Sequence, residues 1–360
     1  MSWRPKAAAH ARALAEVIGA ANVSLVEDCR CVVARPGAAS DVAAVLEVAR
    51  ASRLTVEVAS RDRSPDVVLD LARMARVLHL DDCSLLVHVQ AGSTLAQLEA
   101  GLGERRLSLG AALRWGGERT VGAALASPRP AEGGPCGRFL DACSAVDGVL
   151  ADGTIFSTRM APRRATGPDL AHALLGARGT TGVITAAWLR VTRRLPTRHA
   201  AFVFPDRAAP VAVARALLDR GLRPAQLSVT DRLDAAAGTV LALALDVPSE
   251  VCDAAVGLAA DLATSAGGRP WPAVATLEEW LARPWLPDLR RQRFVPWREL
   301  DAAWAACPAP AELTAFSPAG AALVAESVTP AAPVFPSPTR AAILHQLDPQ
   351  GLFSRPERTA

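Results

Sequence analysis

The stretch that decides the fold begins Gly167-Pro168-Asp169-Leu170. It continues as Leu175-Gly176-Ala177-Arg178-Gly179-Thr180-Thr181-Gly182-Val183-Ile184-Thr185. Glycines at 176, 179 and 182 predict a loop whose backbone can approach another group closely, because glycine has no side chain to block it. Such a loop can aim several amide N–H groups at one anion. The β-branched residues that follow predict a strand over residues 183–191.

Upstream of this loop, short apolar strands alternate with helices. Strands are predicted over 31–34, 54–58, 67–71 and 85–89, and helices over 41–52, 95–103 and 169–175. Ser40 is expected to cap the first helix, and Gly92-Ser93-Thr94 to open the second. Residues 111–138 are rich in Gly and Pro and are interpreted as one long loop. Residues 144–150 and 155–158 predict a β-hairpin.

The order of elements changes after Arg193-Arg194-Leu195-Pro196. Strands over 200–204, 226–230 and 240–246 alternate with helices over 208–220 and 249–265, which is typical of helices on one face of an antiparallel sheet. The Pro-rich residues 329–339 form a connector, and an apolar tail with a short helix over 339–347 follows. The predicted domains are 1–196 (subdomains about 1–110 and 111–196), 197–338, and a tail, 339–360, that returns to the first domain.

Composition excludes several classes of protein. The 360 residues carry 39 Lys+Arg against 36 Asp+Glu, so no basic footprint for nucleic acid exists. An apolar fraction of 51% excludes a disordered chain, and the lack of tyrosine excludes phenol chemistry. No apolar run is long enough to cross a bilayer, so no integral membrane segment is expected. The seven scattered cysteines predict a reducing, cytoplasmic compartment and no metal site.

The segments, taken in order, resemble the FAD-binding domain of the vanillyl-alcohol oxidase and p-cresol methylhydroxylase (PCMH) superfamily, and most of all the smaller flavin-domain subunit of bacterial glycolate oxidase. The likeness covers about residues 30–196 and the tail. Besides the opening stretch, the matching pieces are Val32-Val33-Ala34-Arg35-Pro36, Val68-Leu69-Asp70-Leu71-Ala72-Arg73-Met74, Val89-Gln90-Ala91-Gly92-Ser93-Thr94, Thr120-Val121-Gly122-Ala123, Gly137 with Asp141, Gly148-Val149-Leu150-Ala151-Asp152-Gly153 and Leu347-Asp348-Pro349-Gln350-Gly351-Leu352-Phe353.

This resemblance implies an α+β protein: a PCMH-type FAD-binding fold of two α/β subdomains, followed by an α+β cap domain with an antiparallel sheet. It implies non-covalent FAD, because the loop that could carry a covalent link offers no His or Cys. The residues that it implies around FAD are Gly92, Ser93, Thr94, Thr120, Val121, Gly122, Gly137, Asp141, Gly176, Gly179, Thr180, Gly182, Val183 and Ile184. No catalytic acid or base is indicated, and the histidines are expected to be isolated.

The sequence departs from the family where a glycine-rich phosphate loop is usual. Residues 59–66 contain no glycine and carry Arg61, Asp62 and Arg63 instead, so weak and dissociable FAD is predicted. Cys136 and Pro168 stand where the family often has Tyr, and Ala123 stands where a second glycine is usual.

Two functions follow from this resemblance. In the first, the chain is an FAD-binding subunit that oxidises a 2-hydroxy acid such as glycolate. Its partners would be a second flavin subunit and an iron–sulfur subunit, in the cytoplasm or held at the membrane by those partners. In the second, it is a flavin-free subunit that keeps the fold for assembly. The loop at 176–185 favours the first, and the altered loop at 59–66 favours the second. An unrelated α/β binding protein is a third alternative.

Overall fold

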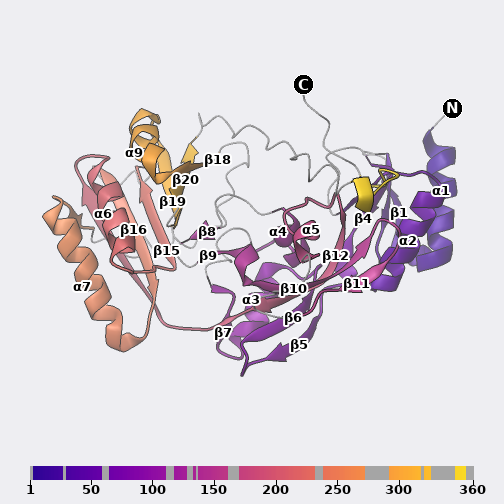
Figure 1. Cartoon of the computed structure of the whole chain (residues 1–360), viewed down its shortest axis with the longest axis horizontal. Helices are drawn as coiled ribbons and strands as arrows, with labels where there is room; N and C mark the ends of the chain where they lie inside the picture. The colour runs from indigo at the N-terminus through magenta and orange to yellow at the C-terminus, as the bar shows by residue number, and fades with distance from the viewer. Residues whose placement is uncertain are drawn as a thin grey trace.

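The computed structural model describes residues 3–26, 30–58, 65–110, 117–127, 133–134, 137–160, 170–231, 238–271, 292–317, 320–325 and 345–353. Figure 1 shows two lobes, with the N-terminal helices at one end of the long axis and α7 (Ser249–Ser265) at the other. The first lobe has one continuous core that runs from the N-terminal helices to residue 191, and the second has its own. The fold class expected from the sequence, α+β with several antiparallel sheets, is confirmed.

The first sheet has the strand order β1-β2-β4-β3. Its strands are β1 (Val23–Val26), β2 (Cys31–Ala34), β3 (Val56–Val58) and β4 (Val67–Leu69). Strands β2 and β3 both run parallel to β4, and the all-apolar sequences of β2 and β4 are typical of buried parallel strands. Helices α1 (Trp3–Ile18) and α2 (Ala39–Ala51) pack into the same core, and the short turns η1 (Ala20–Asn22) and η2 (Leu71–Arg73) flank the strands.

Helix α2 begins differently from the prediction that Ser40 caps it. Ala38 is the N-cap, and its side chain makes no capping bond. The carboxylate of Asp41 accepts a hydrogen bond from the Gly37 N–H instead, at 2.8 Å. The expectation for Ser40 was therefore wrong, because the helix begins at Ala39 and Ser40 already lies within its first turn.

The second sheet is antiparallel throughout, with the order β11-β10-β12-β6-β5. Its strands are β5 (Val77–Asp81), β6 (Leu86–Gln90), β10 (Cys143–Leu150), β11 (Ile155–Ser157) and β12 (Gly182–Arg190). The hairpin of β10 and β11 is confirmed. The chain passes from the first sheet to the second between β4 and β5, and β6 pairs with β12, about 100 residues later in the chain.

A short helix lies inside the segment predicted to be one loop. Helix α4 (Val121–Ala126) begins at Thr120, whose hydroxyl accepts a hydrogen bond from the Ala123 N–H at 3.2 Å. It buries Val121, Ala124 and Leu125. Helix α3 (Leu95–Gly103) opens with a capping box of Thr94 and Gln97. The smaller elements are β7 (Leu107–Ser108), β8 (Gly133–Gly134), β9 (Gly137–Arg138), η4 (Phe139–Ala142), α5 (Ala171–Leu174) and β13 (Thr192–Arg193).

The second lobe is a seven-stranded antiparallel sheet with helices against one face. The strand order is β17-β14-β16-β15-β19-β20-β18. Its elements are β14 (Thr197–Phe204), α6 (Ala209–Asp219), β15 (Gln226–Thr230), β16 (Thr239–Asp246), α7, β17 (Arg269–Pro270), β18 (Gln292–Pro296), α9 (Trp297–Ala306), β19 (Ala311–Ser317) and β20 (Gly320–Ala325). Strands β12 and β14 belong to different sheets, on either side of Pro196.

The C-terminal tail lies in the first lobe. Leu352 and Phe353 are buried in its core, and Phe353 forms a parallel bridge with Val56 beside β3. The Val56 N–H donates to the Leu352 carbonyl at 2.8 Å. The Asp348 carboxylate accepts from the N–H groups of Leu352 and Phe353, which fixes the turn. The predicted connector at 329–339 and most of the helix expected over 339–347 lie outside the described residues.

Candidate functional site

Three segments predicted to surround the cofactor are joined to one another through backbone hydrogen bonds. The Val121 N–H donates to the Ser93 carbonyl at 2.9 Å, and Thr94 and Thr120 form an isolated bridge. The Gly176 N–H donates to the Leu125 carbonyl at 2.9 Å, and the Arg178 N–H to the Ala126 carbonyl at 2.7 Å. The segment after β6, the start of α4 and the loop before β12 thus form one connected surface.

Packing within the chain accounts for three of the glycines on this surface. A Cβ added to Gly92 would lie 1.9 Å from the Leu71 carbonyl oxygen, and one added to Gly182 would lie 2.8 Å from the Val149 carbonyl oxygen. At Gly122 the added atom would lie 2.9 Å from the Ala91 Cβ. The Gly92 and Gly122 N–H groups donate to the carbonyls of Met74 and Ala91. These two amides are therefore already used by the fold.

Gly179 differs from these glycines. Its φ is +68°, and an added Cβ would meet only the Val58 side chain, at the ordinary contact distance of 3.7 Å. Its amide N–H has no hydrogen-bond acceptor within the described ranges. Val58 ends β3 in the first sheet, so Gly179 lies where the two sheets of the lobe meet. Gly176 and Arg178, with φ of +71° and +54°, make the turn that presents this amide.

The other residues predicted to surround the cofactor lie close to this surface. Each of them packs or forms hydrogen bonds within the chain. The Thr180 hydroxyl donates to the Ala177 carbonyl at 2.6 Å, and Val183 and Ile184 are buried in the core. Gly137 pairs with Gly134 in the β8–β9 ribbon, and η4, which contains Asp141, packs against α4. The Asp141 carbonyl accepts a hydrogen bond from the Arg190 guanidinium.

The altered phosphate loop is described only at its exit. The Asp66 carboxylate accepts hydrogen bonds from the Thr55 N–H and hydroxyl at 2.9 and 2.8 Å, which ties the end of the loop to the start of β3. Residues 59–64, with the predicted Arg61, Asp62 and Arg63, lie outside the described residues, as do Cys136 and Pro168.

A row of buried polar side chains in the second lobe was missed by the sequence interpretation. On β15 these are Gln226, Ser228 and Thr230, and on β19 they are Glu312 and Thr314; each is 6% exposed or less. Thr230 pairs with Glu312 across the two strands, and the Ser228 and Thr314 hydroxyls lie 3.4 Å apart. We call this row the polar stripe. The signal was the polar–apolar alternation of residues 226–230, which indicates that one face of the strand is polar.

The polar stripe lies on the face of the sheet that carries no helix. Leu227, Val229 and Leu313, which alternate with it, belong to the helix-side core. Its neighbours on β16 are the small residues Ala242 and Ala244, which form a separate cluster with Trp271. Strand β19 lies against β8 of the first lobe, and Figure 1 shows β8 and β9 between the two lobes. The stripe therefore lies on the side of the second lobe that faces the first.

Side chains on the second sheet form a cluster that the sequence did not predict. His88 Nε2 lies 2.7 Å from Asp147 Oδ2, and the His88 ring stacks on Trp188 at 4.6 Å between ring centroids. His79 also contacts Trp188, so the expectation of isolated histidines was wrong. The reason is that antiparallel pairing places His88 beside Trp188 and His79 beside His88. The imidazole of His88 is thus hydrogen-bonded to Asp147 and stacked on Trp188.

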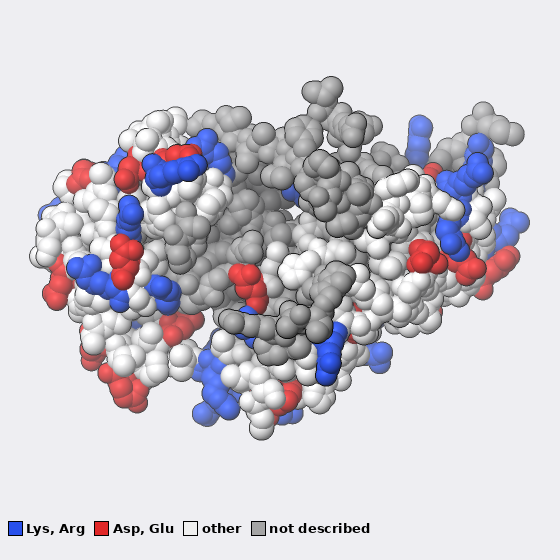
Figure 2. Space-filling view, viewed as in Figure 1, with Lys and Arg blue, Asp and Glu red and all other residues white. Residues whose placement is uncertain are grey.

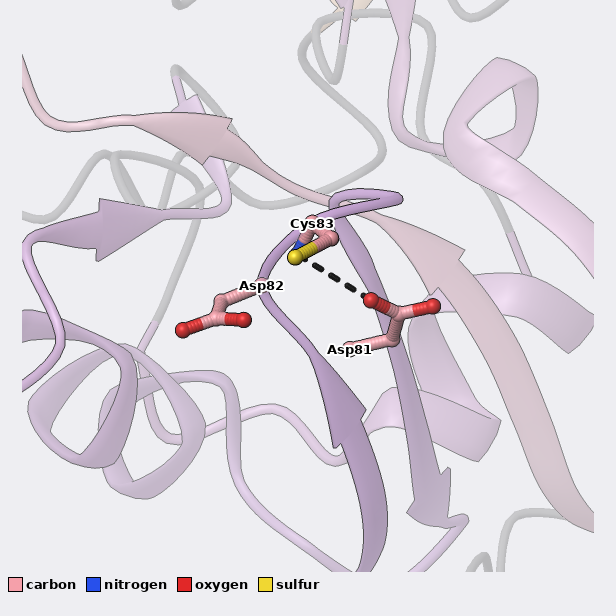
Figure 3. Close-up of side chains that lie close together, drawn as sticks. All are labelled: Asp81, Asp82 and Cys83. Carbon is pink, nitrogen blue, oxygen red and sulfur yellow. Dashed lines mark hydrogen bonds between the residues drawn. The ribbon is translucent and has the colours of Figure 1, made fainter.

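Three side chains that could bind a metal ion lie close together at the turn between β5 and β6. One carboxylate oxygen each of Asp81 and Asp82 and the Cys83 Sγ all lie within 4.8 Å of one another (Figure 3). The Asp81 carboxylate accepts from the N–H groups of Cys83 and Ser84 at 3.0 and 2.9 Å, which closes the turn. Hydrogen bonds from Ser84 lower the pKa of Asp81. The turn itself thus accounts for the position of this carboxylate.

The charge distribution agrees with the composition. Figure 2 shows acidic and basic side chains scattered over both lobes on the face in view, with neither sign dominant. In the part of the chain that the structure describes, no helix is both long and apolar enough to cross a membrane.

Residues 31–159 match the family model of an FAD binding domain. An FAD-linked oxidoreductase of Escherichia coli, YgcU, is 27% identical over 176 residues, which are 48% of this chain and 36% of YgcU. Alkyldihydroxyacetonephosphate synthase of Caenorhabditis elegans is 24% identical over 215 residues, 58% of this chain and 36% of that protein. The chain thus spans about a third of the length of these relatives.

Solved structures share the fold. A crystal structure of alkyldihydroxyacetonephosphate synthase has a TM-score of 0.70 at 15% identity, over 89% of this chain and 76% of that one. p-Cresol methylhydroxylase with substrate bound has a TM-score of 0.67 at 14% identity, over 96% and 87%. Residues 31–159 are thus similar to FAD binding domains, FAD is the cofactor that this similarity indicates, and the chain shares the fold of these solved structures.

Proposed function

We propose that this chain is the FAD-binding part of a flavin-dependent oxidoreductase. The observation that carries the proposal is the Gly179 amide, which has no acceptor in the described part of the chain and lies beside Val58, a residue of the segment that matches an FAD binding domain. Bound FAD supplies the acceptor for the electrons of the substrate. The chain supplies position: the Gly179 N–H is available to a phosphate oxygen, and the surrounding backbone bonds hold it there.

The proposal extends to a small 2-hydroxy acid such as glycolate as substrate, and to a second flavin subunit and an iron–sulfur subunit as partners. The sequence resemblance over residues 30–196 and the tail supports this extension. The hydroxyl and amide groups of the polar stripe, beside β8, suit the hydroxyl group of such a substrate, whereas the Glu312 carboxylate on the same stripe does not suit its acid group.

A flavin-free assembly subunit is the second candidate. The glycine-free residues 59–66 favour it, and so do the Gly92 and Gly122 amides, which donate within the chain. Each lost hydrogen bond to a charged phosphate weakens binding by about 1.5–3 kcal/mol, so a flavoprotein of this kind should hold FAD weakly.

Two substitutions at glycines with the same backbone conformation separate these candidates. Gly179 and Gly351 both have φ of +68°, and both have room for a Cβ. Gly179→Ala and Gly351→Ala should therefore lower the free energy of unfolding by a similar amount, about 1–2 kcal/mol. Only Gly179→Ala should also weaken FAD binding, because the added methyl lies beside the available amide.

The measurement is FAD titration of the isolated chain followed by flavin fluorescence, then anaerobic addition of glycolate or lactate with the flavin absorption recorded. Flavin binding that Gly179→Ala weakens at least tenfold more than Gly351→Ala supports the proposal, and bleaching by a 2-hydroxy acid supports its extension. A folded chain that binds no FAD, alone or with its partner subunits, supports the assembly role instead.

A further inference from the structure

We propose that Gln226 on the polar stripe binds a hydroxyl group of the ligand and so distinguishes an alcohol from the corresponding carbonyl compound. The proposal rests on the proposed function, since the ligand is taken to be the substrate. Gln226 is 6% exposed, and its Oε1 has no hydrogen-bond partner in the residues that the structure describes.

The three hydroxyl side chains of the stripe differ from Gln226 in this respect. The Thr230 hydroxyl donates to the Ala311 carbonyl at 3.3 Å, and the Ser228 hydroxyl lies 3.4 Å from that of Thr314. A buried amide oxygen without a donor costs folding free energy, and an apolar side chain would avoid that cost beside Ala244. The unpaired acceptor is therefore best explained by a donor that arrives with a ligand.

The chemistry of the stripe defines which group it can accept. Its members are hydroxyls, one amide and the carboxylate of Glu312, with no Arg, Lys or His. No side chain of the stripe itself therefore attracts a ligand carboxylate, so the acid group of a 2-hydroxy acid is expected to be held by other residues. The amide oxygen of Gln226 accepts from an alcohol O–H.

The product of alcohol oxidation has no such hydrogen. A carbonyl oxygen and the Gln226 Oε1 are both acceptors, so they repel rather than bind. The stripe should consequently bind the alcohol more tightly than the carbonyl compound. The oxidised product should therefore dissociate more readily than the substrate. Lactate and pyruvate are a suitable pair of probes, since they differ only in this group.

The experiment has two arms and a matched control. In the first arm the melting temperature is measured without ligand for Gln226→Met and for Thr230→Val, an isosteric change on the same face at a hydroxyl that is already bonded. Gln226→Met should leave the melting temperature unchanged or raise it, whereas Thr230→Val should lower it. A loss of stability in Gln226→Met as large as that in Thr230→Val, or failure to fold, overturns the proposal.

In the second arm lactate and pyruvate are titrated into the FAD-loaded chain, and the shift of the flavin absorption is followed. The wild type should bind lactate about tenfold more tightly than pyruvate, and Gln226→Met should bring this ratio close to one. An unchanged ratio overturns the proposal. If neither acid perturbs a bound flavin, the 2-hydroxy acid part of the proposed function fails, and the first arm alone decides the role of Gln226.

Discussion

The glycines of the first lobe and the polar stripe of the second differ in what explains them. The sequence resemblance predicts Gly92 and Gly122 beside the cofactor, yet contacts within the chain already require both to be glycine. Gln226 belongs to no motif, yet nothing described in the chain satisfies its buried oxygen. A motif residue that the fold itself needs says little about a ligand, whereas a buried polar atom that the fold leaves unpaired says more.

The largest effect expected from this comparison is at Gly92. In Gly92→Ala the new Cβ would lie 1.9 Å from a backbone oxygen, so the segment after β6 would have to move and the first lobe should not fold stably. The control is Gly101→Ala in α3, where the added atom meets nothing within 4 Å and alanine should stabilise the helix by about 1 kcal/mol. Soluble expression and thermal unfolding measure both. A Gly92→Ala protein as stable as wild type that only loses FAD would make Gly92 a cofactor residue after all.

The next effect is at the tail. Phe353 is fully buried in the core of the first lobe, so Phe353→Ala should cost about 3–5 kcal/mol of unfolding free energy in that lobe. Phe294→Ala, at a side chain that is 42% exposed in the second lobe, should cost much less. Denaturant unfolding with a probe in each lobe measures the difference. Equal losses in both lobes would show that the lobes do not have separate cores.

Thr94 tests whether a predicted cofactor residue serves the fold. Its hydroxyl accepts the Gln97 N–H in the capping box of α3, so Thr94→Ala should cost about 1 kcal/mol and Thr94→Ser very little. Chemical denaturation of both variants gives these values, and FAD titration shows whether affinity changes with them. A loss of affinity in Thr94→Ser without a loss of stability would assign the threonine to the cofactor.

Local sequence patterns predicted the helices and strands that depend only on their own residues. Helix α3 and the hairpin of β10 and β11 follow from local periodicity and turn residues, and they formed where they were predicted. Helix α4 has six residues, too few to show a period. The sheet to which β5 and β6 belong depends on β12, far along the chain, and no local pattern contains that information.

The candidate site was predictable to a similar extent. The loop at 176–182 is visible in the sequence because its glycines are close together. Its contact with α4 is not, because it is made by backbone bonds such as that from Gly176 to Leu125. The polar stripe required both β15 and β19, which lie about 80 residues apart. Alternation in a single strand indicates a polar face but leaves open what that face meets.

The smallest expected effect is at Asp81. The position of its carboxylate, which could bind a metal ion, already follows from the hydrogen bonds of the turn. Hydrogen bonds from Ser84 lower the pKa of Asp81 in the folded chain. A carboxyl whose pKa is lower when folded adds stability above its unfolded pKa, about 3.9, and that contribution disappears as the pH falls through the folded value. Asp81→Asn should therefore slightly reduce stability at neutral pH and flatten the decline in stability below about pH 4.

Asp82→Asn, at a neighbouring carboxylate that accepts no bond from the turn, is the control. Thermal unfolding from pH 3 to 7, with and without added Ca²⁺ or Zn²⁺, measures this. A rise in melting temperature with either ion in the wild type, lost in Asp81→Asn, would show that the turn is a metal site and that its hydrogen bonds do not explain it.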